Sequence, residues 1–399
     1  MSSTPPAVSR ATPVPAPRTP APGLFLTLLA VCSAVTAANI YLAAPLLTLI
    51  ARDYGSAPSA VAWIASVAQL GYALGLLLFA PLGDTVNRRR LVSGLTVVTA
   101  VALAAAAVAP GSAALAAAVL VASAATVIPQ LLVPLVAERA PAERRARHVA
   151  AVVAGLFTGI VAARVVGGLA GQAFGWRWVF AGAGVLTLAL GLATALVLPS
   201  EHRPRTGPLF GGIAALPGLV RRSPDLWRAC ARQAGMFGAW SALWTSLALL
   251  LTGPEYGLST ATAGLFGLFG LTASVVAPLA GGLVDRFGAG RVVRAAYLLA
   301  AVSVPLFWAG GHVLVALFVA AILIHAALVA SHVANQTLAL TTTSAPATAN
   351  TAYVVAGFAG GAAASALAGP AYTHFGWGGV CAVAGVWLLL GWGTTAVRR

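Results

Sequence analysis

Apolar residues form long runs along this chain, and polar or charged residues are confined to short breaks between the runs. A helix needs about 20 apolar residues to cross the hydrocarbon core of a bilayer. Windows of that length predict twelve membrane-spanning helices, at residues 24–49, 59–80, 91–109, 113–136, 149–173, 178–198, 230–251, 260–280, 292–310, 312–339, 350–372 and 378–396. Proline, glycine and arginine clusters such as Pro110-Gly111 and Gly310-Gly311 mark the breaks.

The composition agrees with this pattern, because 60% of the residues are hydrophobic and 8% are charged. Soluble globular domains are about 45–50% apolar and about 25% charged, so this chain could not cover a water-exposed surface. A secreted domain, a cytosolic enzyme and a nucleic-acid-binding module are therefore excluded. The three cysteines are far apart, and no phosphate-cradling loop, Ser/His/Asp set or HExxH motif occurs, so we expect no disulfide framework, metal site, cofactor or enzymatic activity.

The positions of the arginines predict the orientation in the membrane. All 23 basic residues are arginine, and 20 of them fall in six segments that lie on one side if both termini are cytoplasmic. Only Arg52 and Arg177 fall on the other side, and Arg164 lies within a span. This bias predicts a multi-pass protein of the plasma membrane and explains the net charge of +15 without a nucleic-acid partner.

The chain also repeats itself at a spacing of 201 residues, which separates Asp84 from Asp285 and Gly175 from Gly376. Two landmarks that keep one offset predict two six-helix bundles in the same sense across the membrane. We expect a proline-rich disordered cytoplasmic tail at 1–22, bundles at 23–198 and 230–399, and a cytoplasmic linker at 199–229.

The loop at 80–90 after the second span, its copy at 281–291 and the duplication resemble the major facilitator superfamily over residues 23–397. This resemblance implies an all-α fold of two pseudo-symmetric six-helix bundles and secondary transport of a small molecule by alternating access. The runs at 69–75 and 331–337 are similar to those of a bacterial branch near the drug, sugar and nucleoside exporters of the drug/proton antiporter group. Export by a monomer, with protons as a candidate coupling ion, is the expectation that follows.

Arg164 is the sharpest single feature, because it lies near the middle of the fifth span. A charge at that depth costs at least about 2.5 kcal/mol, and it usually faces a cavity or a partner. The run at 159–168 resembles the antiporter motif of the fifth helix, with arginine where proline is expected, and the 201-residue offset places Ser365 opposite. Arg164 is therefore a candidate substrate or gating residue, and pairing with backbone carbonyls is the structural alternative.

Other polar and aromatic side chains within spans are candidate substrate contacts, although each residue type also occurs as ordinary helix packing. His325, His332 and Gln336 fall roughly on one face of the tenth helix. Trp240 and Trp244 are one turn apart and could stack on a planar or cationic ligand. The remaining candidates are Asn39, Tyr41, Gln130 and Thr245.

The resemblance assigns a gating role to the charges of the two repeated loops, with a purely topological role as the alternative. In the first copy these residues are Asp84, Arg88 and Arg90, and in the second they are Asp285, Arg286 and Arg291. The first copy has Asn87 where the family pattern has glycine.

All eight acidic residues lie in loops or at helix ends, so the mid-membrane carboxylate of many proton-coupled carriers is missing and proton coupling is in question. A secondary exporter is therefore the main hypothesis. A facilitated-diffusion or uptake carrier of the same fold is its closest rival, and a membrane sensor or polytopic membrane enzyme is the alternative from another class.

Overall fold

The computed structural model describes residues 22–139, 145–198, 211–341 and 346–395, and every regular element in these ranges is helical. Helices are expected here, because lipid offers no hydrogen-bond partner to the backbone and a helix satisfies its own N–H and C=O groups. Residues 1–21 of the predicted tail and 199–210 of the predicted linker lie outside the described residues.

The elements up to residue 198 are α1 (Pro22–Ala38), η1 (Asn39–Tyr41), η2 (Ala44–Leu46), α2 (Leu47–Asp53), η3 (Pro58–Val61), α3 (Trp63–Phe79), α4 (Leu82–Thr85), α5 (Arg88–Ala107), α6 (Ser112–Ala125), α7 (Ile128–Arg139), α8 (Arg145–Phe174) and α9 (Trp176–Val197). The later elements are α10 (Gly211–Arg222), α11 (Pro224–Thr252), α12 (Thr260–Leu265), η5 (Phe266–Leu271), α13 (Thr272–Phe287), α14 (Ala289–Ala309), α15 (Leu314–Thr341) and α16 (Pro346–Gly393).

The described residues hold eleven helical segments that are long and apolar enough to cross a membrane. The last of them, Thr348–Gly393, contains a non-helical residue at Gly376 and covers two predicted spans, at 350–372 and 378–396. The breaks predicted at Pro110-Gly111 and Gly310-Gly311 are confirmed, because α5 ends at Ala107 and α14 ends at Ala309.

Two regions differ from the predicted spans. The first span does not run to residue 49 as one helix, because α1 ends at Ala38 and short helices η1, η2 and α2 follow. The interval predicted as a linker contains α10, and α11 begins at Pro224, where Ser223 caps it by accepting a hydrogen bond from the backbone N–H of Leu226.

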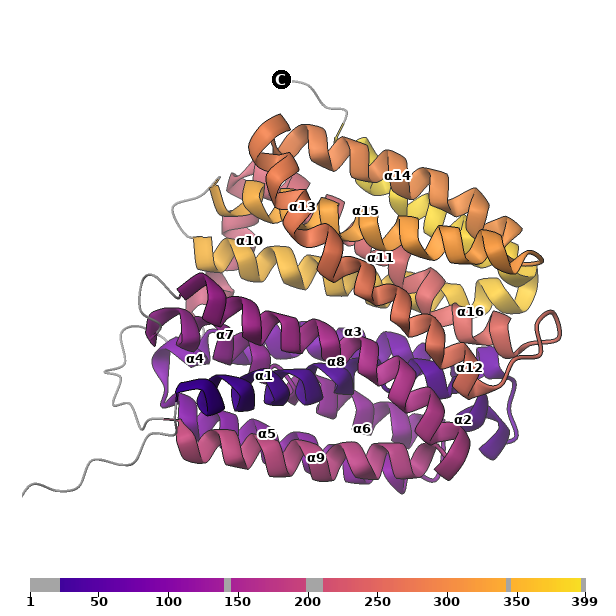
Figure 1. Ribbon diagram of the computed structural model, residues 1–399, viewed down its shortest axis with the longest axis horizontal. Coiled ribbons are helices and arrows are strands. Elements are labelled where there is room, and N and C mark those ends of the chain that lie inside the picture. The colour runs from indigo at the N-terminus through magenta and orange to yellow at the C-terminus, as the bar shows by residue number, and fades with distance from the viewer. Residues whose placement is uncertain (1–21, 140–144, 199–210, 342–345, 396–399) are drawn as a thin grey trace, which may run out of the picture.

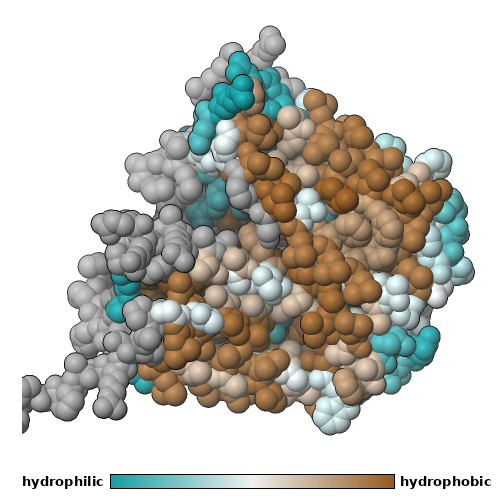
Figure 2. Space-filling model, in the orientation of Figure 1, coloured by the Kyte–Doolittle hydropathy of each residue, from teal (hydrophilic) through white to brown (hydrophobic). Residues whose placement is uncertain are grey.

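The early and late parts of the chain form two stacked groups of roughly parallel helices (Figure 1). Helices α4, α7 and α10 mark one end, which we call the terminal end because the described chain begins there. Helices α2 and α12 mark the opposite, distal end. A broad hydrophobic belt separates the polar ends (Figure 2). Large apolar side chains such as Val101, Val275 and Leu389 are well exposed on the described helices. An apolar surface of this extent fits a lipid environment.

Close backbone contacts hold helices together inside each group. Gly159 of α8 lies against the backbone of Ala34 in α1, and Gly360 of α16 lies against Ala234 in α11. A Cβ atom at either glycine would come within 1.9 or 2.5 Å of the facing carbonyl oxygen. The two glycines are 201 residues apart, so the predicted repeat reappears as a repeated packing contact.

At the distal end of each group, a tyrosine hydroxyl forms a hydrogen bond with a backbone carbonyl. The Tyr54 hydroxyl donates to the Ala109 carbonyl at 3.0 Å, and the Tyr256 hydroxyl donates to the Gly310 carbonyl at 2.8 Å. Near the first bond, Asp53 accepts hydrogen bonds from Trp176 and Arg177. Near the second, the Trp377 indole donates to the Phe307 carbonyl at 2.6 Å.

Candidate functional site

Arg164 lies between the two groups of helices, in the middle of the candidate span Ala154–Phe174 of α8. Its side chain is buried, and its guanidinium carbon lies 5.1 Å from the ring centre of Tyr41, 5.0 Å from Trp240 and 5.4 Å from Trp244. Tyr41 comes from η1 and both tryptophans come from α11, so residues far apart in the sequence surround one cation. Aromatic faces attract a guanidinium through their quadrupoles.

The polar atoms of Arg164 are incompletely satisfied. Its Nε and Nη1 atoms are buried and have no hydrogen-bond partner among the described residues. The three aromatic rings stabilise the positive charge, but they do not accept in-plane N–H bonds as an oxygen would. A buried polar group without a partner costs free energy. An acceptor, which the described residues do not supply, would therefore stabilise the Arg164 side chain.

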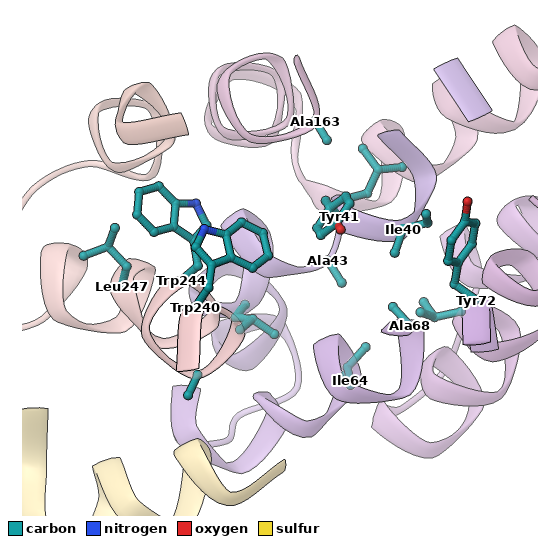
Figure 3. Close-up of a cluster of buried hydrophobic side chains, with 14 of the residues drawn as sticks. Ile40, Tyr41, Ala43, Ile64, Ala68, Tyr72, Ala163, Trp240, Trp244 and Leu247 are labelled. Carbon is teal, nitrogen blue, oxygen red and sulfur yellow. The ribbon is translucent and has the colours of Figure 1, made fainter. Parts of the chain in front are cut away.

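The two tryptophans form one wall of the cluster. Their rings are 6.1 Å apart and nearly parallel, at 8°, and Figure 3 shows both indoles on α11 facing the space beside Tyr41. The four-residue spacing in a helix places them on one face. The two rings stack on each other, and their predicted stacking on a ligand stays a prediction.

His325 of α15 contacts this wall through a hydrogen bond with Trp240. Its Nδ1 atom lies 2.8 Å from the Ala321 carbonyl, and its Nε2 atom lies 3.2 Å from the Trp240 indole nitrogen. A carbonyl only accepts and an indole N–H only donates, so Nδ1 carries the hydrogen and the imidazole is neutral. His325 therefore positions Trp240 and adds no charge to the cluster.

A polar junction lies next to the cluster and was not singled out as a site from the sequence. The Gln69 amide of α3 donates to Ser365 of α16 at 3.2 Å and accepts from Ser241 of α11 at 3.0 Å. Thr245 shares a 3.2 Å hydrogen bond with Ser365. Gln69 is the only amide side chain in the predicted span at 59–80, and this rarity was the available signal.

Two small voids border Arg164, with about 20 and 10 Å³ open to water-sized molecules. Volumes of about 10–15 Å³ hold a single water molecule. The first void lies between η2, α11 and α12, and the second lies beside Gln69 and the tryptophans. Toward the distal end, α12 and η5 pack directly against α8. The cluster is therefore closed, and a larger molecule enters only if the two groups of helices separate.

Several candidates lie away from this cluster. The Asn39 amide donates to Thr126 and Thr187 inside the first group of helices. The Gln130 amide donates to the Tyr72 hydroxyl at 3.3 Å, and the Tyr72 ring contacts Phe358 of α16 across the junction. The candidates Asn39 and Gln130 thus lie inside the first group of helices, behind the surface that faces the second group.

The predicted face of the tenth span is divided between different partners. Only His325 reaches the tryptophans. His332 lies 3.3 Å from the Tyr353 hydroxyl, and the Gln336 amide donates to Asn350 at 2.9 Å. Tyr353 in turn donates to Gln233 at 2.6 Å. The part of this face that holds His332 and Gln336 therefore packs against α16 and α11.

The two loop copies are built differently. In the first, Asn87 caps α5 by accepting from the backbone N–H groups of Arg89 and Arg90, and the buried Arg88 donates to the Gly83 carbonyl at 2.9 Å. The side chain of Asp84 lies outside the described residues, so its predicted pairing with Arg88 and Arg90 stays a prediction.

In the second loop copy, Gly288 ends α13 at φ +82°, a conformation that favours glycine. Asp285, Arg286 and Arg291 are all exposed there. Arg286 lies over the Phe287 ring, and Arg291 donates to the Phe287 carbonyl at 3.3 Å. Asp285 forms no ion pair with the described residues, and the gating role expected of this copy stays a prediction.

Comparison with known proteins gives consistent matches. The sequence pattern of the Major Facilitator Superfamily matches residues 29–265. A protein of Streptomyces coelicolor named "Probable transporter" is 78% identical over 376 residues, which cover 94% of this chain and 87% of that protein. A protein of Escherichia coli K12 named "Putative uncharacterized transporter YgaY" is 33% identical over 363 residues, which cover 90% of this chain and 91% of that one.

Solved structures share the fold at low sequence identity. The nucleoside transporter NupG matches with a TM-score of 0.75 at 15% identity, over 94% of this chain and 99% of that one. A bacterial homologue of the human lysosomal transporter Spinster, in an inward-facing conformation, matches with a TM-score of 0.67 at 17% identity, over 93% of each chain.

Proposed function

Because the chain belongs to the major facilitator superfamily, it is a multi-pass membrane transporter, and we propose that it exports a small molecule across the plasma membrane by alternating access. The two groups of helices act as the two six-helix bundles at 23–198 and 230–399, with both termini in the cytoplasm. In this proposal the bundles rock about the junction where they meet.

One observation carries the proposal: a buried arginine with unused donors lies at mid-depth between two otherwise apolar groups of helices. Ionisable residues inside membrane helices mark transport pathways more often than they mark packing. Tyr41 reaches Arg164 from the first bundle, and Trp240 and Trp244 reach it from the second, so any rocking changes the site itself.

The loops at the terminal end supply the gate in this proposal. Asp84 with Arg88 and Arg90 acts in the first loop, and Asp285 with Arg286 and Arg291 acts in the second. The buried Arg88 supports such a role for the first loop, because its bond to Gly83 ties α5 to the preceding turn. Replacing Asp84 with asparagine is expected to slow turnover, whereas unchanged kinetics would indicate a purely topological loop.

The export direction rests on the runs at 69–75 and 331–337, which are similar to those of drug, sugar and nucleoside exporters. Facilitated diffusion is a second candidate, and a specific observation favours it. His325 is neutral by its hydrogen bonds, and the acidic side chains that the structure describes lie at the ends of the helices. The described spans thus hold no carboxylate away from the helix ends that could carry a coupling proton.

The test begins with purified protein and a thermal-shift screen against nucleosides, sugars, cationic drugs and organic anions. Each compound that stabilises the protein is then labelled and tested for counterflow in proteoliposomes. A carrier is expected to show counterflow of at least one stabilising compound. A compound that binds and shows none would contradict transport and favour a sensor.

A second arm separates the two modes of transport. Under proton-coupled export, a protonophore is expected to abolish accumulation of the labelled compound against its gradient. Under facilitated diffusion no accumulation occurs, and the protonophore leaves the equilibration rate unchanged.

A further inference from the structure

We infer that the central site takes an organic monoanion with a flat apolar body, and that the anionic group binds the free N–H groups of Arg164. This inference rests on the proposed carrier function and names the substrate class of the same site. Four properties of the cluster support it: its missing counter-charge, the geometry of its rings, its single charge and the lining of the void beside it.

The first property is a charge imbalance. The acidic side chains that the structure describes are occupied or exposed at the ends of the helices: Asp53 pairs with Arg177, Asp225 with Arg228 and Glu255 with His312, while Asp285 is exposed. None of them faces Arg164. A buried cation without a counter-charge is costly, and an anion that arrives with the substrate would remove that cost.

The second property is the geometry of the rings. Aromatic faces are negative and repel an anion, so the faces of Tyr41, Trp240 and Trp244 accept the guanidinium and exclude a carboxylate. The N–H groups of the guanidinium are different, because they lie in its plane, and Nε and Nη1 have no partner there. These two nitrogens point from different edges of the guanidinium, and each can donate a charge-assisted hydrogen bond to an oxygen of a carboxylate or phosphate group.

The third property is the amount of charge. Arg164 is the only charged side chain of the cluster, since the hydrogen bonds of His325 fix its neutral tautomer. The neighbouring Gln69, Ser241 and Ser365 are neutral donors and acceptors. One positive charge balances one negative charge, so a monoanion fits and a dianion would leave one charge buried without compensation.

The fourth property is the lining of the void on one side of Arg164. Its walls are apolar and include Pro45, Trp244, Leu247, Ala263 and Phe266. Elements of both bundles contribute, so a flat hydrocarbon body in this place would touch both of them. The void is smaller than any such body, and the bundles must part to admit it, which links binding to the opening of the carrier.

The test uses three probes of nearly equal shape: naphthalene-2-carboxylate, the neutral naphthalene-2-carboxamide and the cationic 2-naphthylmethylammonium. Binding of each labelled probe is measured by equilibrium methods on the full chain in lipid nanodiscs, with empty nanodiscs as the blank. We expect the carboxylate to bind at least about tenfold more tightly than the amide, because charge-assisted hydrogen bonds are the stronger ones.

Replacing Arg164 with alanine is expected to invert this preference. The variant loses the anion site and keeps three aromatic rings around an empty space, which is an arrangement that binds organic cations. The ammonium probe should then bind more tightly than the carboxylate. Arg294→Ala removes an exposed arginine of α14 and serves as the matched control, with the preference of the unaltered protein retained. If Arg164→Ala does not fold, Arg164→Gln provides the same loss of charge with a side chain that still fills the site.

The outcomes separate the inference from the function on which it rests. Equal binding of carboxylate and amide by the unaltered protein, or tighter binding of the ammonium probe, overturns the anion site. Carboxylate binding that depends on Arg164, without counterflow in proteoliposomes, upholds the anion site and contradicts the carrier. Counterflow of a neutral nucleoside, without carboxylate binding, upholds the carrier and overturns the inference.

Discussion

The first and second bundles use the same fastening at the distal end and different chemistry at the centre. The Tyr54 hydroxyl donates to the Ala109 carbonyl, and the Tyr256 hydroxyl donates to the Gly310 carbonyl. The two acceptors, Ala109 and Gly310, are 201 residues apart. At mid-depth, the first bundle has Arg164, whereas the equivalent position of the second bundle is Ser365, which bonds to Gln69. The duplication therefore repeats the framework, while the charge is present on one side only. A substrate held at the centre would meet a cation on one bundle and neutral groups on the other.

The strongest test of the shared framework is to crowd its close helix contacts. Gly159→Leu and Gly360→Leu are each expected to prevent correct folding, because the added side chain would collide with a backbone carbonyl. Overpacking typically costs about 1–3 kcal/mol and occasionally more. Yield and size-exclusion profiles in detergent measure the effect, and Gly94→Leu is the control, since nothing lies within 4 Å of that position. Damage from only one of the two substitutions would contradict the repeat.

The central difference is tested by moving the charge. Arg164→Ser is expected to lower substrate affinity by roughly 30-fold or more, since losing one partner of a buried charge pair costs about 2–5 kcal/mol. Adding Ser365→Arg should not restore affinity, because Tyr41, Trp240 and Trp244 surround residue 164. Counterflow at varied substrate concentration measures both variants. Full recovery in the double variant would mean that the two bundles are interchangeable at their centre.

The two loop copies provide a smaller contrast. Gly288→Ala is expected to destabilise the protein by about 1–3 kcal/mol, because φ +82° with ψ +145° is strained for other residues. Asn87→Ala should cost about 1 kcal/mol through the lost helix cap, and Asn87→Gly only a few tenths. Thermal unfolding in detergent ranks the three variants. An equal effect of Gly288→Ala and Asn87→Gly would show that the loops are more alike than their geometry indicates.

Small effects are also expected at the repeated tyrosine bonds. Tyr54→Phe and Tyr256→Phe should each cost about 0.5–1.5 kcal/mol, with similar values in the two bundles.

Burial raises the pKa of both phenols, partly offset at Tyr54 by Arg177, while Glu255 raises the pKa of Tyr256 further. A raised pKa in the folded state means that this stabilisation is present below the usual tyrosine pKa of about 10 and is lost at higher pH. Unfolding curves of the unaltered protein and of each variant at pH 8 and above pH 10 measure it, and a difference between them that does not shrink above pH 10 would contradict the sign.

Much of the fold could be predicted from the sequence because lipid imposes simple rules. The length of the apolar runs indicated the spans, and Pro110-Gly111 and Gly310-Gly311 marked breaks that the structure confirms. The short helices after Ala38 were missed because the run from 39 to 50 is apolar apart from Asn39 and Thr48, although Pro45 was an available signal of a break. Helix α10 was missed because its apolar run is too short to cross a membrane and contains Pro217 and Gly218, which are typical of a loop.

The centre of the site was only partly predictable. Depth alone pointed to Arg164, and helical spacing paired Trp240 with Trp244. Spacing could not show that Asn39 turns into the first bundle, since the direction of a side chain depends on neighbours such as Thr126 that are distant in the sequence. For the same reason His325 and His332 share a helix and meet different partners.

Gln69 gives the junction between the bundles a distinctive way of coming apart. One end of its amide bonds to α11 and the other end bonds to α16, and both ends turn about a single terminal torsion. A rotation that breaks one bond breaks the other at the same moment. Both partners belong to the second group of helices, so separating the two groups costs this one side chain both of its hydrogen bonds, and its amide then needs water or a substrate as a new partner.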